Sequence, residues 1–322
     1  MQQSLIVGVD GGGTHSRLVA VRPDGTVLAL AEGGGVNFNA IGMDEARQRL
    51  HAALADLLQR CGATGYGALA VGMSALDDRP DQALVRQFAG DLLDADRLTM
   101  HSDVYMALMG ATLGGPGAMV ISGTGAMAIA LDGAGRVHTR AGWGYLLDDP
   151  GSAYAVAVQA LRAALSAWEG VGEATALCDR ALQFFGTPDE RALIASIYQP
   201  PVEPARIAQF ARAVLSAAAE GDAVAAGLVD RNMAYLAGQA ARLAALCPPG
   251  AGVYLYGGMF EHNAWVTGLF GEKLAALRPG AKTLRPEFPP EIGAVISHLK
   301  QAGGLTGGVV ANLRRTWRRN AV

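Results

Sequence analysis

A glycine-rich turn near the start of the chain restricts the possible folds more than any other feature. The apolar residues Leu5 to Val9 indicate a buried strand, which is followed by Asp10, Gly11, Gly12, Gly13 and Thr14. After this turn comes an alternating run, Ser16 to Val21, and then Asp24-Gly25, a combination typical of a β-hairpin. A dinucleotide-binding turn needs a helix at this point and a P-loop needs Lys before Ser or Thr, so the sequence excludes both.

The composition of this turn favours an anion ligand. Glycines have no Cβ, so backbone amides can approach an anion closely. A carboxylate such as Asp10 at the end of an apolar strand is costly unless it is solvated, paired or bound to a cation. A simpler alternative is that the glycines and Thr14 only close a tight turn, but Asp10 favours a phosphate-binding hairpin.

The same pattern returns in the second half of the chain. A short apolar strand, Ala118 to Ile121, leads into a turn of small residues, namely Ser122, Gly123, Thr124 and Gly125. The strand Ala126 to Leu131 and Asp132-Gly133 follow, as in the first half. An internal duplication explains this recurrence most simply. We therefore expect two half-domains, each with a phosphate hairpin, that face each other across a cleft.

The length and the remaining periodicity give the domain organisation. A chain of 322 residues favours two domains. Gly and Pro at positions 114–117 form the clearest linker, so we expect an N-terminal domain over 1–116 and a C-terminal domain over 117–322. Residues 152–246 show helical spacing and predict a helical insert in the second domain. The last helix is expected to return to the first domain.

Charge, termini and cysteines exclude several classes of protein. The net charge of −3 predicts no general affinity for nucleic acid or acidic membranes. Since the start lacks a secretory pattern and no apolar run is long enough to span a membrane, we expect a cytoplasmic protein. The 3 cysteines are far apart and lack CxxC spacing, which argues against a disulfide framework or a zinc site.

These turns, in this order, resemble the sugar kinase, actin and Hsp70 superfamily. Residues 10–14 are similar to its first phosphate segment, 122–125 to the second, and 256–259 to the adenosine segment. The resemblance implies an α/β fold of two ribonuclease H-like domains around a central cleft, with ATP bound between them. It implies nucleotide contacts at Gly11, Gly12, Gly13, Thr14, Gly123, Thr124, Gly257 and Gly258. Because Mg²⁺ prefers oxygen ligands and keeps several waters, Asp10 is the candidate metal ligand.

Within this superfamily the chain is most similar to the N-acetylglucosamine kinase branch, close to the BadF/BadG ATPase group. The evidence is Asn37, Asp103 and the run from Gly142 to Ala153, which begins Gly-Trp-Gly. The resemblance implies that Asp103 is the base and that the sugar is bound by Asn37, Gly125, Trp143, Asp149 and Ala153. Pro150 stands where the branch has a Glu, so a contact made by that carboxylate is missing here.

Each of these residues also has a purely structural explanation. Asp103 could cap the helix that follows it, and Asp149 could cap a helix beginning near Pro150. Trp143 could pack in the core, and Asn37 could be a turn residue. The sequence alone leaves these alternatives open.

The expected function is ATP-dependent transfer of the γ-phosphate to the 6-hydroxyl of N-acetylglucosamine or glucosamine. One alternative is a BadF-type ATPase activator, which would need cysteine ligands for a cluster. Another is a nucleotide-dependent sugar sensor without catalysis. The resemblance favours a homodimer.

Overall fold

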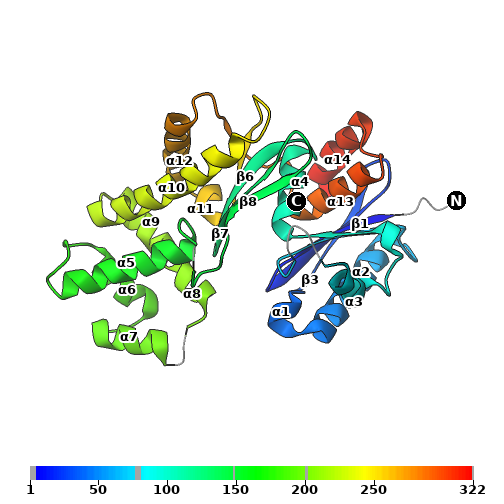
Figure 1. The fold of residues 1–322 in the computed structure, drawn as a ribbon. Helices are drawn as coiled ribbons and strands as arrows, with labels where there is room; N and C mark the ends of the chain where they lie inside the picture. The colour runs from blue at the N-terminus through cyan, green and yellow to red at the C-terminus, as the bar shows by residue number, and fades with distance from the viewer. Residues whose placement is uncertain (1–4, 77–80, 148, 200–201, 321–322) are drawn as a thin grey trace. The chain divides into compact units, whose positions relative to one another are not determined.

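The computed structural model describes residues 5–76, 81–147, 149–199 and 202–320. The chain forms two compact units: unit 1 contains Met1–Gly115 together with Pro286–Val322, and unit 2 contains Pro116–Arg285 (Figure 1). The predicted second domain ran from 117 to 322 with only the last helix returning. In the structure the whole segment after Arg285, with two helices, belongs to unit 1.

The sheet of unit 1 begins with three antiparallel strands and continues with two parallel ones. Its order in the described residues is β3-β2-β1-β4-β5, with β1 antiparallel to β2 and parallel to β4. The glycine turn connects β1 directly to β2, which confirms the hairpin that the sequence predicted. The strands are β1 (Ile6–Gly11), β2 (His15–Val21), β3 (Val27–Gly34), β4 (Ala68–Met73) and β5 (Leu98–His101).

Helices cover both faces of this sheet, with α13 and α14 on one side and α2 and α3 on the other (Figure 1). The sequence predicts a helix over residues 80–93, and Pro80 lies outside the described residues. The helices are α1 (Phe38–Ile41), α2 (Met43–Cys61), α3 (Gln82–Ala89), the 3₁₀ helix η1 (Ala95–Arg97), α4 (Asp103–Thr112), α13 (Pro290–Gln301) and α14 (Gly307–Asn320).

Two glycines explain why α13 belongs to unit 1. A Cβ on Gly8 of β1 would lie 2.1 Å from the carbonyl oxygen of Glu291, and a Cβ on Gly293 would lie 1.8 Å from that of Met106 in α4. Helix α13 therefore packs against β1 and α4 at a distance that only glycine permits.

Unit 2 repeats the plan of unit 1. Its sheet has the order β10-β9-β6-β7-β8 in the described residues, again with an antiparallel hairpin and two parallel neighbours. The strands are β6 (Gly117–Ser122), β7 (Ala126–Leu131), β8 (Val137–Ala141), β9 (Val253–Tyr256) and β10 (Thr283–Leu284). The common strand order supports the internal duplication inferred from the sequence.

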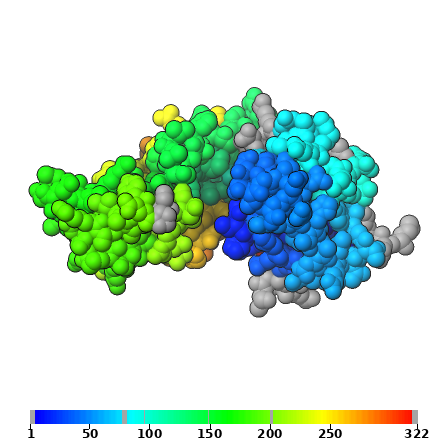
Figure 2. Space-filling model, turned by 90° about the horizontal axis from the view of Figure 1, so that it is seen from below, coloured from blue at the N-terminus to red at the C-terminus, as the bar shows by residue number. Residues whose placement is uncertain are grey.

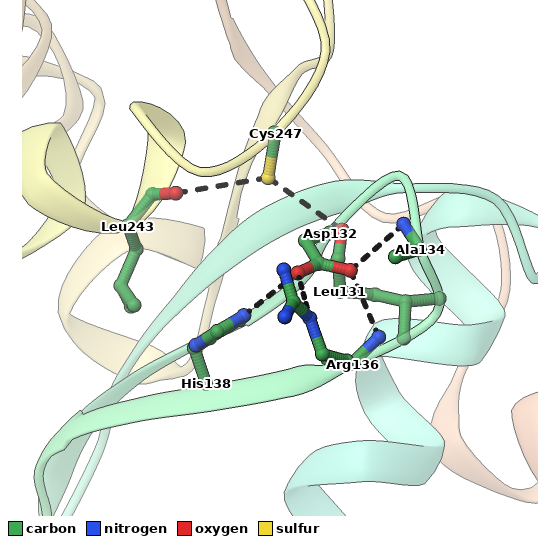
Figure 3. A network of polar contacts seen from close by, with 7 residues as sticks. All are labelled: Leu131, Asp132, Ala134, Arg136, His138, Leu243 and Cys247. Carbon is green, nitrogen blue, oxygen red and sulfur yellow. Dashed lines mark hydrogen bonds and ion pairs between the residues drawn. The ribbon is translucent and has the colours of Figure 1, made fainter.

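The turn between β7 and β8 is held by one carboxylate (Figure 3). Asp132 accepts hydrogen bonds from the backbone amides of Ala134 and Arg136 at 2.8 and 2.9 Å. Its second oxygen accepts from Arg136 Nε at 2.9 Å and contacts His138 Nε2 at 3.0 Å. These contacts, led by that with His138, hold the pKa of Asp132 below its usual range. The nearby Cys247 is buried and, like the other two cysteines, free.

The helices of unit 2 form the insert that the sequence predicted and two further segments near the end of the unit. In Figure 2 the insert, coloured green to yellow-green, forms much of the visible surface of this unit. No described helix combines the length and apolar character needed to cross a membrane. The helices are α5 (Ala153–Trp168), α6 (Leu177–Phe185), α7 (Glu190–Tyr198), α8 (Pro204–Gln209), α9 (Ala211–Ala219), α10 (Ala223–Ala244), α11 (Gly258–Glu261) and α12 (Ala264–Leu277).

Candidate functional site

The glycine turn of unit 1 is anchored at its base and exposed at its tip. The Gly12 amide donates to the His15 carbonyl at 3.0 Å, and the Gly12 carbonyl accepts from Val36 at 3.1 Å. A Cβ on Gly11 would come within 2.7 Å of the Val36 side chain, so this buried glycine has a packing role. Gly13 and Thr14 are exposed. These two residues are therefore the part of the predicted phosphate segment that a ligand can reach.

Two of the predicted functional carboxylates lie beside each other in unit 1. Asp10, the next-to-last residue of β1, pairs with Gly72 of β4, and Asp103 is the first residue of α4. A Cβ on Gly72 would lie only 3.3 Å from the Asp103 Cα, so Gly72 allows α4 to approach the sheet next to Asp10. The structure thus brings together the predicted metal ligand and the predicted base.

The surroundings disfavour ionisation of both carboxyl groups. Burial, then the charges of Glu291 and Asp103, raise the pKa of Asp10 to about 7, although Arg17 on the neighbouring strand acts in the opposite direction. Burial also raises the pKa of Asp103, while its hydrogen bond from the Val104 amide at 2.8 Å opposes the rise. A bound cation would relieve the cost of ionising Asp10.

Sequence reasoning missed a third carboxylate, Glu291, in the first turn of α13. Its residue exposure is 3%, and its Oε2 atom has no hydrogen-bond partner among the described residues. Burial raises its pKa as well. A charged residue directly after Pro289 and Pro290 and before an apolar helical run was the signal that could have revealed it.

The carboxylates of unit 1 fit a hydrated Mg²⁺ better than a fully protein-coordinated metal. Their oxygens are the donors that a hard cation prefers, and Mg²⁺ needs only one or two of them. No three His, Cys, Asp or Glu side chains in the described part of the chain are arranged to enclose a metal ion. Asp10 at the end of β1 therefore remains the candidate ligand.

The helix caps of unit 1 bear on the structural alternatives for Asp103 and Asn37. The cap of α4 is Ser102, whose Oγ accepts from the Tyr105 amide at 3.1 Å, so the capping alternative for Asp103 is wrong. Asn37 does cap a helix: its Oδ1 accepts from the Asn39 amide, and its Nδ2 donates to Ser74 Oγ, both at 3.0 Å. Sugar binding by Asn37 stays a prediction.

In unit 2 the second phosphate turn is joined to the start of α5. The Gly123 and Thr124 carbonyls accept from the Ala153 and Tyr154 amides at 2.8 and 3.4 Å. The Asp149 carboxylate, which is buried, lies 3.1 Å from the position that a Cβ on Gly125 would occupy. Three of the predicted sugar-binding residues, Gly125, Asp149 and Ala153, are thus neighbours.

Two further structural alternatives are wrong. Helix α5 begins at Ala153, and its cap is Ser152, which accepts from the Ala155 amide at 2.9 Å; Asp149 does not cap it. Trp143 has an exposed fraction of 70%, so it is not part of the core. Its neighbours Tyr145, Leu146 and Leu147 are also exposed, and Asp148 lies outside the described residues.

A pocket of about 860 Å³ in unit 2 connects the predicted nucleotide segments. Gly123, Thr124 and Gly258 contribute to its lining, and so do residues of α8 and α9. Gly257 has a φ of +101°, and a Cβ there would lie 2.5 Å from the Ser122 carbonyl oxygen, so the 256–259 segment packs directly on the phosphate turn. Small-molecule pockets commonly fall in this range of volume.

Curated amino sugar kinases match most of the chain. An N-acetyl-D-glucosamine kinase of Dictyostelium discoideum is 28% identical over 312 residues, which are 92% of this chain and 98% of that protein. An N-acetylmuramic acid/N-acetylglucosamine kinase of Clostridium acetobutylicum is 29% identical over 221 residues, 68% of this chain and 72% of that protein.

A solved structure and a family model agree with these relatives. A candidate N-acetylglucosamine kinase from Chromobacterium violaceum superposes with a TM-score of 0.73 at 28% identity, covering 92% of this chain and 99% of that one. The two-unit α/β architecture of actin-like sugar kinases is therefore confirmed. The model of the BadF/BadG/BcrA/BcrD ATPase family matches residues 7–297, and the chain belongs to that family.

Proposed function

We propose that this protein is an ATP-dependent amino sugar kinase that transfers the γ-phosphate of ATP to the 6-hydroxyl of N-acetylglucosamine or glucosamine. The observation that carries the proposal is the placement of Asp103 beside Asp10 across Gly72. A metal carboxylate and a second carboxylate at the same sheet edge are what a hydroxyl-phosphorylating site requires. The amino sugar kinases among the relatives support the substrate class.

In this proposal Asp103 orients the sugar hydroxyl and accepts its proton. A base works best when its pKa lies near the operating pH, and burial moves the pKa of Asp103 upward in that direction. Since Ser102 satisfies the end of α4, the Asp103 carboxylate is not needed as a cap. Hydrogen bonds from the Val104 amide and from its own backbone amide hold its orientation.

The nucleotide would be held by backbone and small side chains. Gly13 and Thr14 in unit 1, and Gly123 and Thr124 in unit 2, are the candidates for phosphate contacts. Gly13, Thr14 and Thr124 are exposed, and exposed amides and hydroxyls bind such oxygens well. Asp10 would hold Mg²⁺, which when bound supplies positive charge to the β- and γ-phosphate oxygens. The pocket beside Gly258 has room for the adenosine.

The sugar would be held mainly by unit 2 residues. The exposed face of Trp143 can stack on the apolar C–H face of a sugar ring, and Asp149 can accept from its hydroxyls. Pro150 offers no carboxylate for a substituent at carbon 2, so discrimination between N-acetylglucosamine and glucosamine must come from other groups.

A coupled assay of ADP release over a panel of amino sugars and hexoses tests this function. We expect ADP release that depends on the sugar and is highest with N-acetylglucosamine or glucosamine. Asp103→Asn should lower kcat by about 10² to 10⁴ with unchanged folding. Asp44→Asn, an exposed carboxylate in the first turn of α2, is the matched control and should keep wild-type turnover.

The same assay separates the alternatives. Binding of sugar and nucleotide without sugar-dependent ADP would identify a sensor and refute the kinase proposal. A BadF-type activator needs cysteine ligands, and here Cys61, Cys178 and Cys247 are free, with burial raising the pKa of each thiol. The homodimer and the cytoplasmic location stay predictions.

A further inference from the structure

The peptide of Gly151 is held from both sides by buried side chains of unit 2. Its N–H donates to Asn232 Oδ1 of α10 at 2.7 Å, and its carbonyl accepts from Ser122 Oγ of β6 at 2.6 Å. Both side chains are almost fully buried, with 3% exposure for Asn232 and 0% for Ser122. Buried hydrogen bonds between well-aligned groups hold a loop peptide in one orientation.

Helix α10 also fixes Gly151 sterically. Leu236 lies one turn after Asn232 on the same face of the helix, and a Cβ on Gly151 would come within 2.4 Å of its side chain. Gly151 has a φ of +91°, which other residues rarely adopt. The peptide therefore sits in a slot of α10 that accepts only glycine.

The orientation of the Asn232 amide is itself determined. Its Nδ2 donates to Gln159 Oε1 of α5 and to the Leu228 carbonyl, both at 2.8 Å. Oδ1 must then face the Gly151 N–H. Burying an amide among the apolar side chains of α10 costs free energy unless the amide is hydrogen-bonded. If position 232 only had to fill space, an apolar residue would serve there without that cost.

The held peptide lies between the two parts of the site in unit 2. Asp149, two residues earlier, lies against Gly125. Ser152, the next residue, caps α5, whose first amides donate to the Gly123 and Thr124 carbonyls. Movement of the Gly151 peptide would therefore displace the Asp149 carboxylate and the phosphate turn together.

We propose that Asn232 is a positioning residue for phosphoryl transfer, which acts by holding the Gly151 peptide and through it Asp149 and residues 122–125. This inference rests on the proposed function, because it assigns the sugar and phosphate contacts to those residues. A shift of about 1 Å in a reacting group can cost about 10² in rate. The insert, through α10, thus takes part in the geometry of the reaction.

The test compares Asn232→Leu with the wild type in the full-length chain. We expect kcat/KM for the sugar to fall roughly 10- to 100-fold. The Kd of ATP measured without sugar should change by less than about threefold, because most of the lining of the pocket beside Gly258 comes from α8, α9 and residues 258–265 rather than from residues 122–125. Asp230→Asn, an exposed residue of α10 paired with Lys273, is the matched control and should keep wild-type kcat/KM.

Two further variants distinguish positioning from folding. Asn232→Asp keeps an acceptor for the Gly151 N–H but loses the donor to the Leu228 carbonyl, so it should recover part of the kcat/KM that Asn232→Leu loses. Ser122→Ala removes the opposite hydrogen bond. Because both side chains hold the same residue, Gly151, the loss in the double variant with Asn232→Leu should be smaller than the product of the single losses. If Asn232→Leu does not fold, Ser122→Ala carries the test, and wild-type kcat/KM in that variant would overturn the inference.

Hydrogen exchange of the segment around Gly151 gives a readout that does not need activity. We expect faster exchange there in Asn232→Leu than in the wild type, and unchanged exchange overturns the inference. If the wild type releases no ADP with any sugar, the proposed function fails while this measurement still reports on the held peptide. An active enzyme in which exchange accelerates but kcat/KM stays within about twofold also refutes the positioning role.

Discussion

Replacement of Asp10 by Asn should stabilise the metal-free protein at neutral and alkaline pH. The ordinary pKa of an Asp is 3.8, and in the folded chain that of Asp10 is about 7. Between these values the folded protein binds more protons at this site than the unfolded chain, so the free energy of unfolding falls as the pH rises. A difference of about three pH units corresponds to at most about 4 kcal/mol. Since the side chain is half-buried and partly screened by water, we expect about half of that.

Denaturant unfolding of the wild type and Asp10→Asn in EDTA, from pH 5 to pH 8.5, measures this effect. The advantage of the variant should grow up to about pH 7 and then level off, because Asp10 is ionised in both states above that pH. Asp44→Asn on α2 serves as the control and should track the wild type. Parallel profiles for the wild type and Asp10→Asn would refute the reasoning. Mg²⁺ with ATP should stabilise the wild type more than the variant.

Two other substitutions test unit 2. Trp143→Ala should raise the sugar KM roughly fivefold through loss of about 1 kcal/mol of stacking, with kcat little changed, and an unaltered KM in the coupled assay would contradict sugar stacking. Asp132→Asn should destabilise the β7–β8 turn above pH 4. Because the pKa of Asp132 is lowered, chiefly by His138, its contribution is present above the unfolded pKa and is lost as the pH falls through the folded value. Thermal unfolding at pH 7 and pH 3 should therefore show a smaller difference between variant and wild type at the lower pH.

The local parts of the fold could be predicted from the sequence because their signals are local. The glycine turns at 11–14 and 123–125 are flanked by alternating strands and followed by Asp-Gly, and both hairpins formed as expected. The placement of the helices on the sheet was harder to predict from the sequence. The packing of α13 on β1 depends on Gly8 and Gly293, which are far apart in the chain, and no short-range pattern connects them.

Some residues of the candidate site could likewise be predicted from local sequence patterns, and others could not. Asp10 was identified because it follows an apolar strand and Asp103 because it matches the amino sugar kinase pattern, whereas the burial of Glu291 became visible only when α13 was placed on the sheet. The two caps were within reach of sequence rules, since Ser102 and Ser152 stand directly before their helices and Ser is a preferred capping residue. Asn232 is a polar residue among the apolar positions of α10, which signals a buried hydrogen bond. The sequence did not show that its partner is the Gly151 N–H.

The charge balance of unit 1 makes a cation an electrostatic requirement for the proposed reaction. When they are ionised, Asp10, Asp103 and Glu291 add negative charge next to the exposed tip of the glycine turn. Arg17, whose charge lowers the pKa of Asp10, lies 3.8 Å from Glu32 on the neighbouring strand and is shared with it. A polyphosphate at Gly13 and Thr14 would meet net repulsion unless a divalent ion neutralised Asp10. The Asp10 carboxylate, which destabilises the metal-free protein when it is ionised, would therefore also make phosphate binding depend on the metal.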